Sequence, residues 1–313
     1  MFGEAEIVVP AELADLHQKY SGQSGQAWIS ALPDLAARCI DHWQLQVDGE
    51  STFGAVALII PVARRDGSKA VLKLQPVDDE TAGEPAALET WAGRGAVRLL
   101  GHEAGSGAML LERLDASRDL TVVDDDLAAA RIIAELLVQL NSVPAPDGMR
   151  RLGDIAAGIL AQAPNAVRLA ADADERRLLS VCAARLDEMI TDPIEDRLLH
   201  WDLHYFNVLS TRDGSQRWTA IDPKPLSGDS GFELMPALWN RWEDLIQTAD
   251  LTRALLRRFD VMSEVMALDR SRAATWTLAR VLQNAVWDLV SFHEHQIQSA
   301  QRTIAEVLLN NRA

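Results

Sequence analysis

The sequence is poor in cysteine and contains no long apolar run. Its 313 residues include two cysteines, Cys39 and Cys182, too few for a disulfide framework, and we expect both to be buried reduced thiols. No apolar stretch approaches the roughly 18 residues that a membrane-spanning helix needs. The N-terminus lacks the basic start and apolar core of a signal peptide. These absences predict a cytoplasmic protein without a membrane partner.

Positive charge is also scarce. There are 30 Lys and Arg against 46 Asp and Glu, which gives a net charge of −16. Nucleic acids bind through contacts between their phosphates and Lys or Arg, so a nucleic-acid partner is not expected. An acidic chain attracts cationic small molecules, although such charge can also serve solubility alone. No repeat or flexible linker divides the chain.

The candidate chemistry is concentrated between residues 197 and 225, which read RLLHWDLHYFNVLSTRDGSQRWTAIDPKP. Short apolar runs separated by Gly214 predict a small hairpin, with Asp202, Asn207 and Asp222 at its mouth. Asp202 can accept or orient the proton of an acceptor hydroxyl. Asn207 and Asp222 carry hard oxygen ligands suited to Mg²⁺, which bridges the phosphates of ATP. The spacing therefore favours phosphoryl transfer from Mg·ATP.

The same segment resembles a known motif. The H-x-D-x-x-x-x-N pattern that begins at His200 is similar to the catalytic loop of protein-kinase-like enzymes, and Asp222 stands where they carry the metal-binding Asp. The run LLHWDLHYFNVL, followed by AIDPKPLSGDSGFELMPAL, is most similar to the streptomycin and hydroxyurea phosphotransferase family. Trp201 departs from the Gly common at this place in aminoglycoside kinases, and Pro223 departs from the Phe-Gly of protein kinases. Neither change removes a catalytic group.

The resemblance implies an α+β, two-lobed protein-kinase-like fold. A β-rich N-terminal lobe would occupy residues 1–114, and a mainly helical C-terminal lobe would occupy residues 115–313. The residue pattern agrees with this division. Residues 43–113 alternate between apolar runs and polar turns, after a helical stretch at 4–42 with a break at 21–25, and a helix is expected at 78–93. Residues 115–196 show helical periodicity, and a long helix is expected from 271 to about 296.

A lysine at the end of an apolar run in the first lobe resembles the lysine strand of kinases. The resemblance implies that Lys73 binds the α- and β-phosphates of ATP and pairs with a Glu of the following helix. Glu84 is the candidate because it lies four residues before Leu88 and shares its helix face. Glu80 is the alternative partner. Glu84 could instead serve only as the last residue of a capping box that starts at Thr81.

The turn that would cover the phosphates is degenerate. It has glycines only at positions 49 and 54, so it is not a complete G-x-G-x-x-G loop, and the chain has no Walker A motif. Ser51 and Thr52, with exposed backbone N–H groups, could still cap phosphates. By position, Glu112 and Leu114 would form the hinge, where backbone groups commonly bind adenine.

Acidic residues beside tryptophans follow the catalytic segment and suit a sugar that bears ammonium or guanidinium groups. Together with Asp202, the candidate substrate residues are Glu233, Trp239, Trp287 and Asp288. The sequence therefore predicts an ATP-dependent kinase of a hydroxylated, cationic small molecule, with an aminoglycoside such as streptomycin as the leading acceptor. Hydroxyurea or another small hydroxylated metabolite is the alternative.

Two other classes of protein compete with this interpretation. A non-catalytic nucleotide-binding module would explain the degenerate glycine loop, although all three polar groups of the catalytic segment are intact. A metal-dependent hydrolase would use His200, Asp202 and His204 as a zinc site. A protein kinase is disfavoured because the stretch after Asp222 is too short for a long activation loop.

Overall fold

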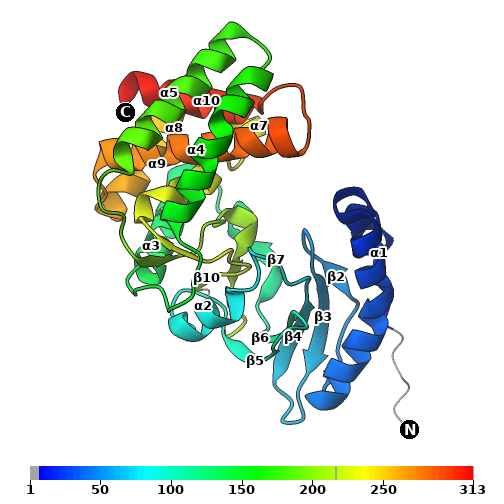
Figure 1. The fold of residues 1–313 in the computed structure, drawn as a ribbon. Helices are drawn as coiled ribbons and strands as arrows, with labels where there is room; N and C mark the ends of the chain where they lie inside the picture. Colours follow the sequence, from blue (N-terminus) through cyan, green and yellow to red (C-terminus); the bar gives the residue numbers. More distant parts are fainter. Residues whose placement is uncertain (1–6, 216, 313) are drawn as a thin grey trace. The chain divides into compact units, whose positions relative to one another are not determined.

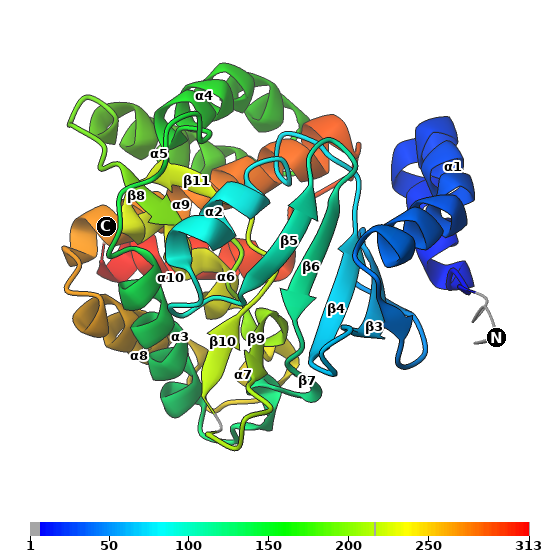
Figure 2. The same cartoon turned by 90° about the horizontal axis from the view of Figure 1, so that it is seen from below.

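The computed structural model describes residues 7–215 and 217–312 and divides into two compact units (Figures 1 and 2). Unit 1 contains the described residues of Met1–Asp115 and Thr211–Gln216, and unit 2 contains those of Ala116–Ser210 and Arg217–Ala313. Unit 1 is built on an antiparallel sheet, whereas unit 2 is mainly helical. The predicted α+β class, with strands first and helices second, is confirmed.

The sheet of unit 1 has the strand order β1-β3-β4-β6-β5, with β2 paired to β3. The strands are β1 (Gln46–Val47), β2 (Thr52–Phe53), β3 (Leu58–Ala63), β4 (Lys69–Leu74), β5 (Leu99–Glu103) and β6 (Ala108–Glu112). In β4, Leu72 and Leu74 join the core beneath helix α1 (Ala11–His42). Because strand side chains alternate between faces, Lys73 points to the opposite face, toward helix α2 (Glu84–Trp91).

The helices of unit 1 depart from the predicted bounds for local reasons. Helix α1 is interrupted at Gly22 (φ 55°, ψ −128°), within the predicted break, and residues 4–6 of the predicted stretch lie outside the described residues. Helix α2 begins at Glu84 rather than at Asp78, because the Asp78 carboxylate accepts the backbone N–H of Thr81 in a separate turn. The predicted capping box does not form: the N-cap is Gly83, without a side-chain bond.

Unit 2 is organised around helix α9 (Arg270–Val286), in which every residue from 273 to 283 is buried. The other helices of unit 2 are α3 (Asp126–Leu140), α4 (Leu152–Leu169), α5 (Ala173–Met189), α6 (Leu234–Leu238), α7 (Trp242–Leu245), α8 (Leu251–Val265) and α10 (Ser299–Asn311). The long helix predicted to reach Gln296 ends at Val286 and continues as a π-helical turn, Trp287–Ser291. A helix that is buried all round is a core helix, and α9 therefore positions much of the unit.

Short strands carry the predicted catalytic segment. Strands β9 (Val208–Ser210) and β10 (Trp218–Ala220) form the predicted hairpin, and β7 (Asp115–Asp119) pairs with β9. Strand β8 (Arg197–Leu199) pairs with β11 (Leu226–Gly228). Cys39 and Cys182 are both buried free thiols. Over the described ranges, no helix combines the length and the apolar character needed to cross a bilayer.

A buried arginine ties three helices of unit 2 together. Arg258 of α8 is fully buried, and its Nε donates to the Asp126 carboxylate at the start of α3 over 3.1 Å. Its Nη1 donates to the backbone carbonyls of Leu238 and Asn240, both at 2.8 Å. Replacing Arg258 leaves the buried backbone carbonyls without their donor, and it leaves the Asp126 carboxylate, whose side chain is 34% exposed, without its cation.

We therefore expect Arg258→Met to lower the free energy of unfolding by about 3–5 kcal/mol. Urea denaturation measures the change. Arg257→Met alters the exposed neighbouring arginine and should shift stability by no more than about 0.5 kcal/mol. Similar losses in the two variants would contradict a special role for Arg258.

Candidate active site

In unit 2, three hydrogen bonds join residues 200–207 of the catalytic segment to residues 221–224. The Ile221 N–H donates to the Asn207 carbonyl over 2.9 Å, and the Lys224 N–H donates to the His200 carbonyl over 3.0 Å. His200 Nε2 lies 3.0 Å from the Ile221 carbonyl. Asp222 follows Ile221 directly, so these bonds hold it beside the loop that carries Asp202 and Asn207.

The polar groups of this loop have distinct surroundings. Asn207 is 7% exposed, and its Nδ2 donates to the Asp202 backbone carbonyl over 2.9 Å, so its amide oxygen is the atom suited to a cation. Burial raises the pKa of the Asp202 carboxyl, the charge of Asp222 adds to this rise, and the charge of Arg280 opposes it. A carboxylate and an amide oxygen are hard donors, and Mg²⁺ usually takes few protein ligands beside phosphate. The donor set of Asn207 and Asp222 therefore fits Mg²⁺.

The geometry does not support the alternative zinc trio of His200, Asp202 and His204. Both ring nitrogens of His200 are used within the loop: Nε2 bonds to the Ile221 carbonyl, and Nδ1 accepts the Asp202 N–H. Burial lowers the pKa of His200 to about 3, so the ring is neutral. Among the described residues, no group of three His, Cys, Asp or Glu side chains is arranged to hold a metal.

Two residues of the segment have left-handed backbone conformations: Trp201 (φ 69°) and Asp222 (φ 55°). Such angles are uncommon for residues other than glycine and persist only where surrounding contacts impose them. The Gly common in aminoglycoside kinases would adopt this conformation at position 201 without strain. Here Glu233 stabilises it, because its Oε2 accepts the Trp201 N–H over 2.8 Å and its Oε1 accepts the His200 N–H over 2.6 Å.

These contacts correct the assignment of Glu233 as a substrate residue. Its side chain is fully buried, and both oxygens hold the loop that precedes Asp202. Burial raises the pKa of Glu233 to about 7, against the pull of the two N–H groups and of Arg280, which lower it. Glu233 therefore positions the catalytic loop through its two hydrogen bonds, and its side chain is too buried to contact a substrate.

Replacing Glu233 with Gln turns an amide NH₂ toward one of the two backbone donors. We expect a loss of about 1–3 kcal/mol in the free energy of unfolding, because one buried N–H loses its acceptor. In the native state the carboxyl keeps its proton up to about pH 7, against 4.5 ordinarily, so wild-type stability falls as pH rises through that interval. The Glu233→Gln variant has no carboxyl group at this position, so its stability should not show this fall with pH. Urea denaturation across the interval checks both effects, with exposed Glu243→Gln as the control; identical pH slopes in all three proteins would contradict the role of Glu233.

The Trp201 side chain packs into unit 2 and is 2% exposed. The Arg280 guanidinium lies 4.5 Å from its ring centre and the Arg150 guanidinium lies 4.7 Å away, both within cation–π range. The Trp287 ring lies 6.2 Å from the Trp201 ring and 5.5 Å from the Arg280 guanidinium. Trp287, a predicted substrate residue, thus helps to pack the catalytic loop. Sequence reasoning did not single out Arg280, which is 8% exposed and whose charge acts on both Asp202 and Glu233.

Trp239 has a different environment. It lines a cavity of about 440 Å³ in unit 2, next to the catalytic loop, and Phe206 and Trp242 line the same cavity. Asn240 also lines it, is 7% exposed, and has an amide nitrogen with no hydrogen-bond partner among the described residues. Asp288 does not line this cavity; it is half-buried, and burial raises the pKa of its carboxyl. The structure thus brings Trp239, but not Asp288, to this cavity beside the loop.

In unit 1, the predicted lysine–glutamate pair is present. Lys73 Nζ lies 2.8 Å and 2.9 Å from the two carboxylate oxygens of Glu84, the candidate partner. The two residues are 4% and 1% exposed. Gln75, which sequence reasoning did not single out, donates its Nε2 to Glu84 over 2.6 Å. A buried ion pair is weak evidence for stability, so stability alone does not account for the Lys73–Glu84 pair.

The remaining predicted cofactor residues also lie in unit 1. Ser51 is half-buried, and Thr52 is exposed in the short strand β2. Glu112 uses its carboxylate on Arg98, accepting its backbone N–H over 2.9 Å and its Nε over 3.0 Å. Leu114 is 7% exposed. Because the Glu112 carboxylate is engaged with Arg98, a hinge at residues 112 and 114 would contact adenine through backbone groups.

The antiparallel sheet with a buried lysine–glutamate pair, together with the helical unit that carries the H-x-D loop, defines a kinase-like phosphotransferase. The family model described as aminoglycoside/hydroxyurea antibiotic resistance kinase matches residues 42–290. The chain belongs to this family, and the family resemblance and the kinase class predicted from the sequence are confirmed.

Two relatives show how much of the chain is shared. Streptomycin 6-kinase of Streptomyces glaucescens is 50% identical over 283 residues, which cover 90% of this chain and 91% of that kinase. Hydroxyurea phosphotransferase of Kitasatospora aureofaciens is 47% identical over 307 residues, which cover 97% of this chain and 87% of that enzyme.

A solved structure shares the fold. The aminoglycoside phosphotransferase of Streptomyces rimosus, solved with ADP and streptomycin, matches with a TM-score of 0.52 at 16% identity, covering 81% of this chain and 98% of that one. This likeness confirms the predicted protein-kinase-like fold.

Proposed function

We propose that the chain transfers the γ-phosphate of ATP to a hydroxyl of an aminoglycoside, with streptomycin as the leading acceptor. The observation that carries the proposal is the loop of unit 2, in which backbone bonds bring Asp222 beside Asp202 and Asn207. The 50% identity to a streptomycin 6-kinase supports the choice of acceptor. A cytoplasmic location, where ATP is available, fits this activity.

In unit 2, Asp202 accepts the proton of the acceptor hydroxyl. Its partial burial raises the pKa of the carboxyl and makes the carboxylate a stronger base, while the nearby charges of Arg280 and Lys224 favour its ionised form. Asn207 and Asp222 would hold Mg²⁺, which supplies positive charge to the transferring phosphates. Glu233 and Trp201 act through the loop, because they fix the backbone on which Asp202 stands.

In unit 1, Lys73 binds the α- and β-phosphates, and Glu84 holds the lysine ammonium in place from beneath. Ser51 and Thr52 cap phosphate oxygens, and the backbone at Glu112 and Leu114 binds adenine. A lysine held by a carboxylate is a recurring part of phosphoryl-transfer sites, since it neutralises phosphate charge without chemistry of its own.

The acceptor is a cationic sugar held near the catalytic loop. The net charge of −16 attracts such a molecule. The cavity lined by Phe206, Trp239 and Trp242 offers aromatic faces, and the Asn240 amide offers a donor to a sugar oxygen. Hydroxyurea is the second candidate, because a hydroxyurea phosphotransferase is 47% identical over 97% of this chain.

The test is ³¹P NMR of the purified protein with Mg·ATP and one acceptor at a time: streptomycin, hydroxyurea or a neutral sugar. We expect a phosphorylated streptomycin whose formation slows at high salt, because screening weakens the attraction of a cation. Phosphorylation of hydroxyurea with streptomycin unchanged would favour the second candidate. Nucleotide binding without transfer to any acceptor would favour a non-catalytic module.

A further inference from the structure

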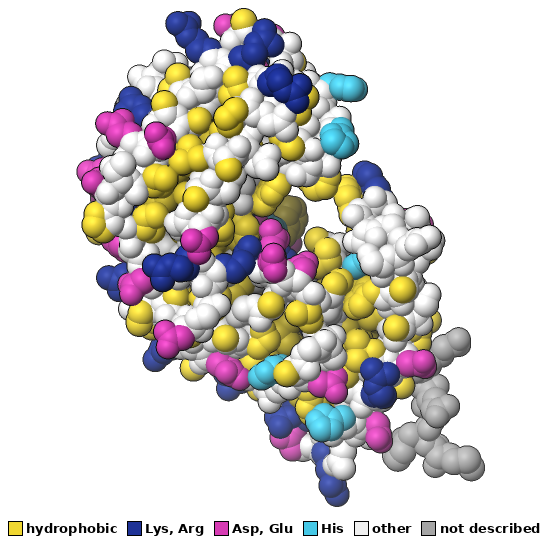
Figure 3. All heavy atoms as spheres, in the orientation of Figure 1, with side chains coloured by type: hydrophobic (Ala, Val, Ile, Leu, Met, Phe, Trp, Pro, Cys, Tyr) yellow, Lys and Arg dark blue, Asp and Glu magenta, His cyan; other side chains and the backbone are white. Residues whose placement is uncertain are grey.

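Three polar side chains of unit 1 are buried together. Lysine and glutamate are almost never fully buried unless they are paired, and Figure 3 shows many charged side chains on the surface. Lys73 and Glu84 are instead 4% and 1% exposed. Gln75 is 2% exposed and bonds to Glu84 as well. The lysine–glutamate pair therefore has a third, neutral member.

The two donors of this group share one carboxylate oxygen. Lys73 Nζ lies 2.9 Å from Glu84 Oε2, and Gln75 Nε2 donates to the same oxygen over 2.6 Å. Lys73 Nζ also lies 2.8 Å from Glu84 Oε1. A hydrogen bond to an ionised acceptor is stronger than one between neutral groups. The amide is therefore a substantial second anchor for the Glu84 carboxylate.

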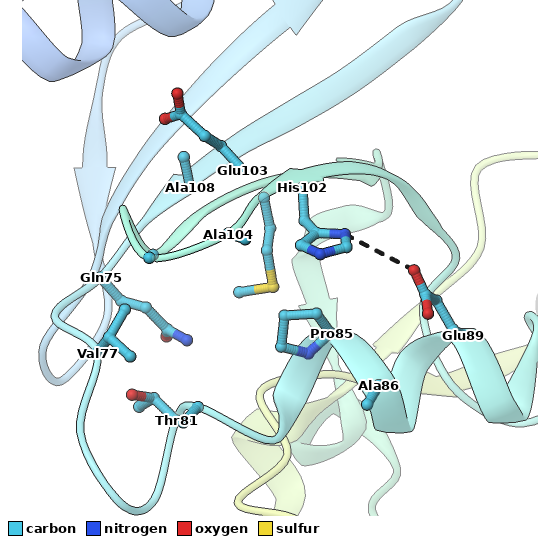
Figure 4. A pocket seen from close by; sticks show the side chains of 14 residues that line it. Gln75, Val77, Thr81, Pro85, Ala86, Glu89, His102, Glu103, Ala104 and Ala108 are labelled. Atoms are coloured by element: carbon cyan, nitrogen blue, oxygen red, sulfur yellow. Dashed lines mark ion pairs between the residues drawn. The ribbon is translucent and has the colours of Figure 1, made fainter. Parts of the chain in front are cut away.

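The backbone fixes the position of this amide. Gln75 follows strand β4 directly, two residues after Lys73, so both side chains leave the same face of the strand. Its N–H donates to the Gly107 carbonyl over 3.2 Å, and a Cβ atom on Gly107 would collide with the Gln75 carbonyl oxygen. Only glycine permits this close approach. Figure 4 shows the Gln75 carboxamide extended toward the start of α2, near Thr81 and Pro85.

The orientation of the amide does not serve stability. Gln75 Oε1 is buried and has no hydrogen-bond partner among the described residues. Turning the amide over would bring this oxygen against the Glu84 carboxylate, where Nε2 now donates. A buried polar atom without a partner destabilises the folded chain. Stability alone therefore does not account for a glutamine at this position, and the contact with Glu84 is the reason that the structure offers.

We propose that Gln75 is a positioning residue of the nucleotide site, which fixes the Glu84 carboxylate so that Lys73 is held where it meets phosphate. The proposal rests on the nucleotide-binding role of Lys73 under the proposed function. Phosphate attracts the Lys73 ammonium away from Glu84, and an ammonium has only three N–H donors to share. Without the Gln75 amide, the carboxylate would be freer to follow the lysine. Gln75 thus acts through Glu84 rather than by contact with the nucleotide.

Gln75→Met removes the amide donor but keeps an unbranched side chain of similar length. We expect it to weaken the affinity for a non-hydrolysable Mg·ATP analogue about tenfold, because Lys73 is less well held. Adenosine has no phosphate for the lysine and should bind with unchanged affinity. Isothermal titration measures the analogue, and ligand-observed NMR measures adenosine. A change that merely loosens unit 1 weakens both ligands, so equal losses would overturn the proposal.

The acetylation rate of Lys73 tests the same contact without a nucleotide. Mass spectrometry after treatment with acetic anhydride reports each lysine separately. In Gln75→Met, Lys73 should react at least about fivefold faster than in the wild type, because its carboxylate partner is less well held. Exposed Lys69 should react at the wild-type rate. Gln26→Met, the same change at an exposed position of helix α1, is the matched control and should leave both rates and both ligand affinities unchanged.

A double-mutant cycle shows whether Gln75 acts through Glu84. In a Glu84→Gln background no carboxylate holds Lys73, so Gln75→Met should weaken the affinity for the Mg·ATP analogue by no more than about twofold further. A second loss of about tenfold in that background would mean that Gln75 acts independently of Glu84, contrary to the proposal.

Two further results would contradict the proposal: an unchanged affinity of Gln75→Met for the Mg·ATP analogue, and an unchanged acetylation rate of Lys73 in this variant. If the wild-type chain binds no Mg·ATP analogue, the proposed function fails, and the role of Gln75 at a nucleotide site fails with it. The acetylation rates still decide whether Gln75 holds the Lys73–Glu84 pair, so the two failures are distinguishable.

Discussion

Asp222→Ala is expected to abolish measurable phosphate transfer and to weaken the affinity for Mg·ATP. The variant leaves Asn207 as the one remaining protein ligand of the proposed pair, and phosphate charge is then under-neutralised. Metal ions contribute several kcal/mol of charge stabilisation to such reactions, so the loss in rate should be about 10³-fold or more. The fold should survive, because the bonds that hold this stretch come from the backbone of Ile221 and Lys224.

The measurement combines turnover with titration of an ATP analogue at several Mg²⁺ concentrations. Asp192→Ala removes an exposed carboxylate of the same unit and should leave both quantities unchanged. Near-full activity of Asp222→Ala would show that Asp222 does not hold the metal. A rate loss with unchanged Mg²⁺ dependence would point to a structural role at its left-handed backbone position (φ 55°).

Local sequence patterns predicted the elements that carry the proposed chemistry. The apolar run that contains Lys73 predicted strand β4, and strand geometry then places Lys73 on the face opposite Leu72 and Leu74. The kinase resemblance implied that Lys73 pairs with a Glu of the following helix, helical periodicity favoured Glu84, and the structure shows that pair. These predictions depend on neighbours a few residues apart, where strand and helix geometry leave little freedom.

The contacts that sequence reasoning missed join residues far apart in the chain. Glu233 binds the N–H groups of residues 33 and 32 positions earlier, and Arg258 pairs with Asp126 across 132 positions. Helix and strand periodicity relate residues only a few positions apart, so they cannot predict such a contact. The sequence suggested Glu233 as a substrate residue because it is an acid near tryptophans. In the structure it is buried, and its side chain instead accepts two backbone N–H groups and so positions the catalytic loop.

Gln75 shows a third kind of omission. A glutamine two residues after the strand lysine belongs to no motif. It matters because of two hydrogen bonds to distant residues, from its Nε2 to the Glu84 carboxylate and from its backbone N–H to the Gly107 carbonyl. The start of α2 was missed for a related reason, since the turn stabilised by the Asp78 carboxylate competes locally with a longer helix.

Asp202→Asn is expected to slow phosphate transfer by about 10²–10⁴-fold while sparing nucleotide binding. The amide has the shape of the carboxylate but cannot accept the proton of the acceptor hydroxyl. The loop should keep its geometry, because Asn207 bonds to the backbone carbonyl of Asp202 rather than to its side chain. Since burial raises the pKa of the Asp202 carboxyl, wild-type activity should fall on the acid side as this group takes up a proton. Isothermal titration with a non-hydrolysable ATP analogue, beside turnover measurements, separates the two effects. Retained affinity with a large rate loss supports a base at position 202, and equal losses of affinity and rate would instead make Asp202 a structural residue of the loop.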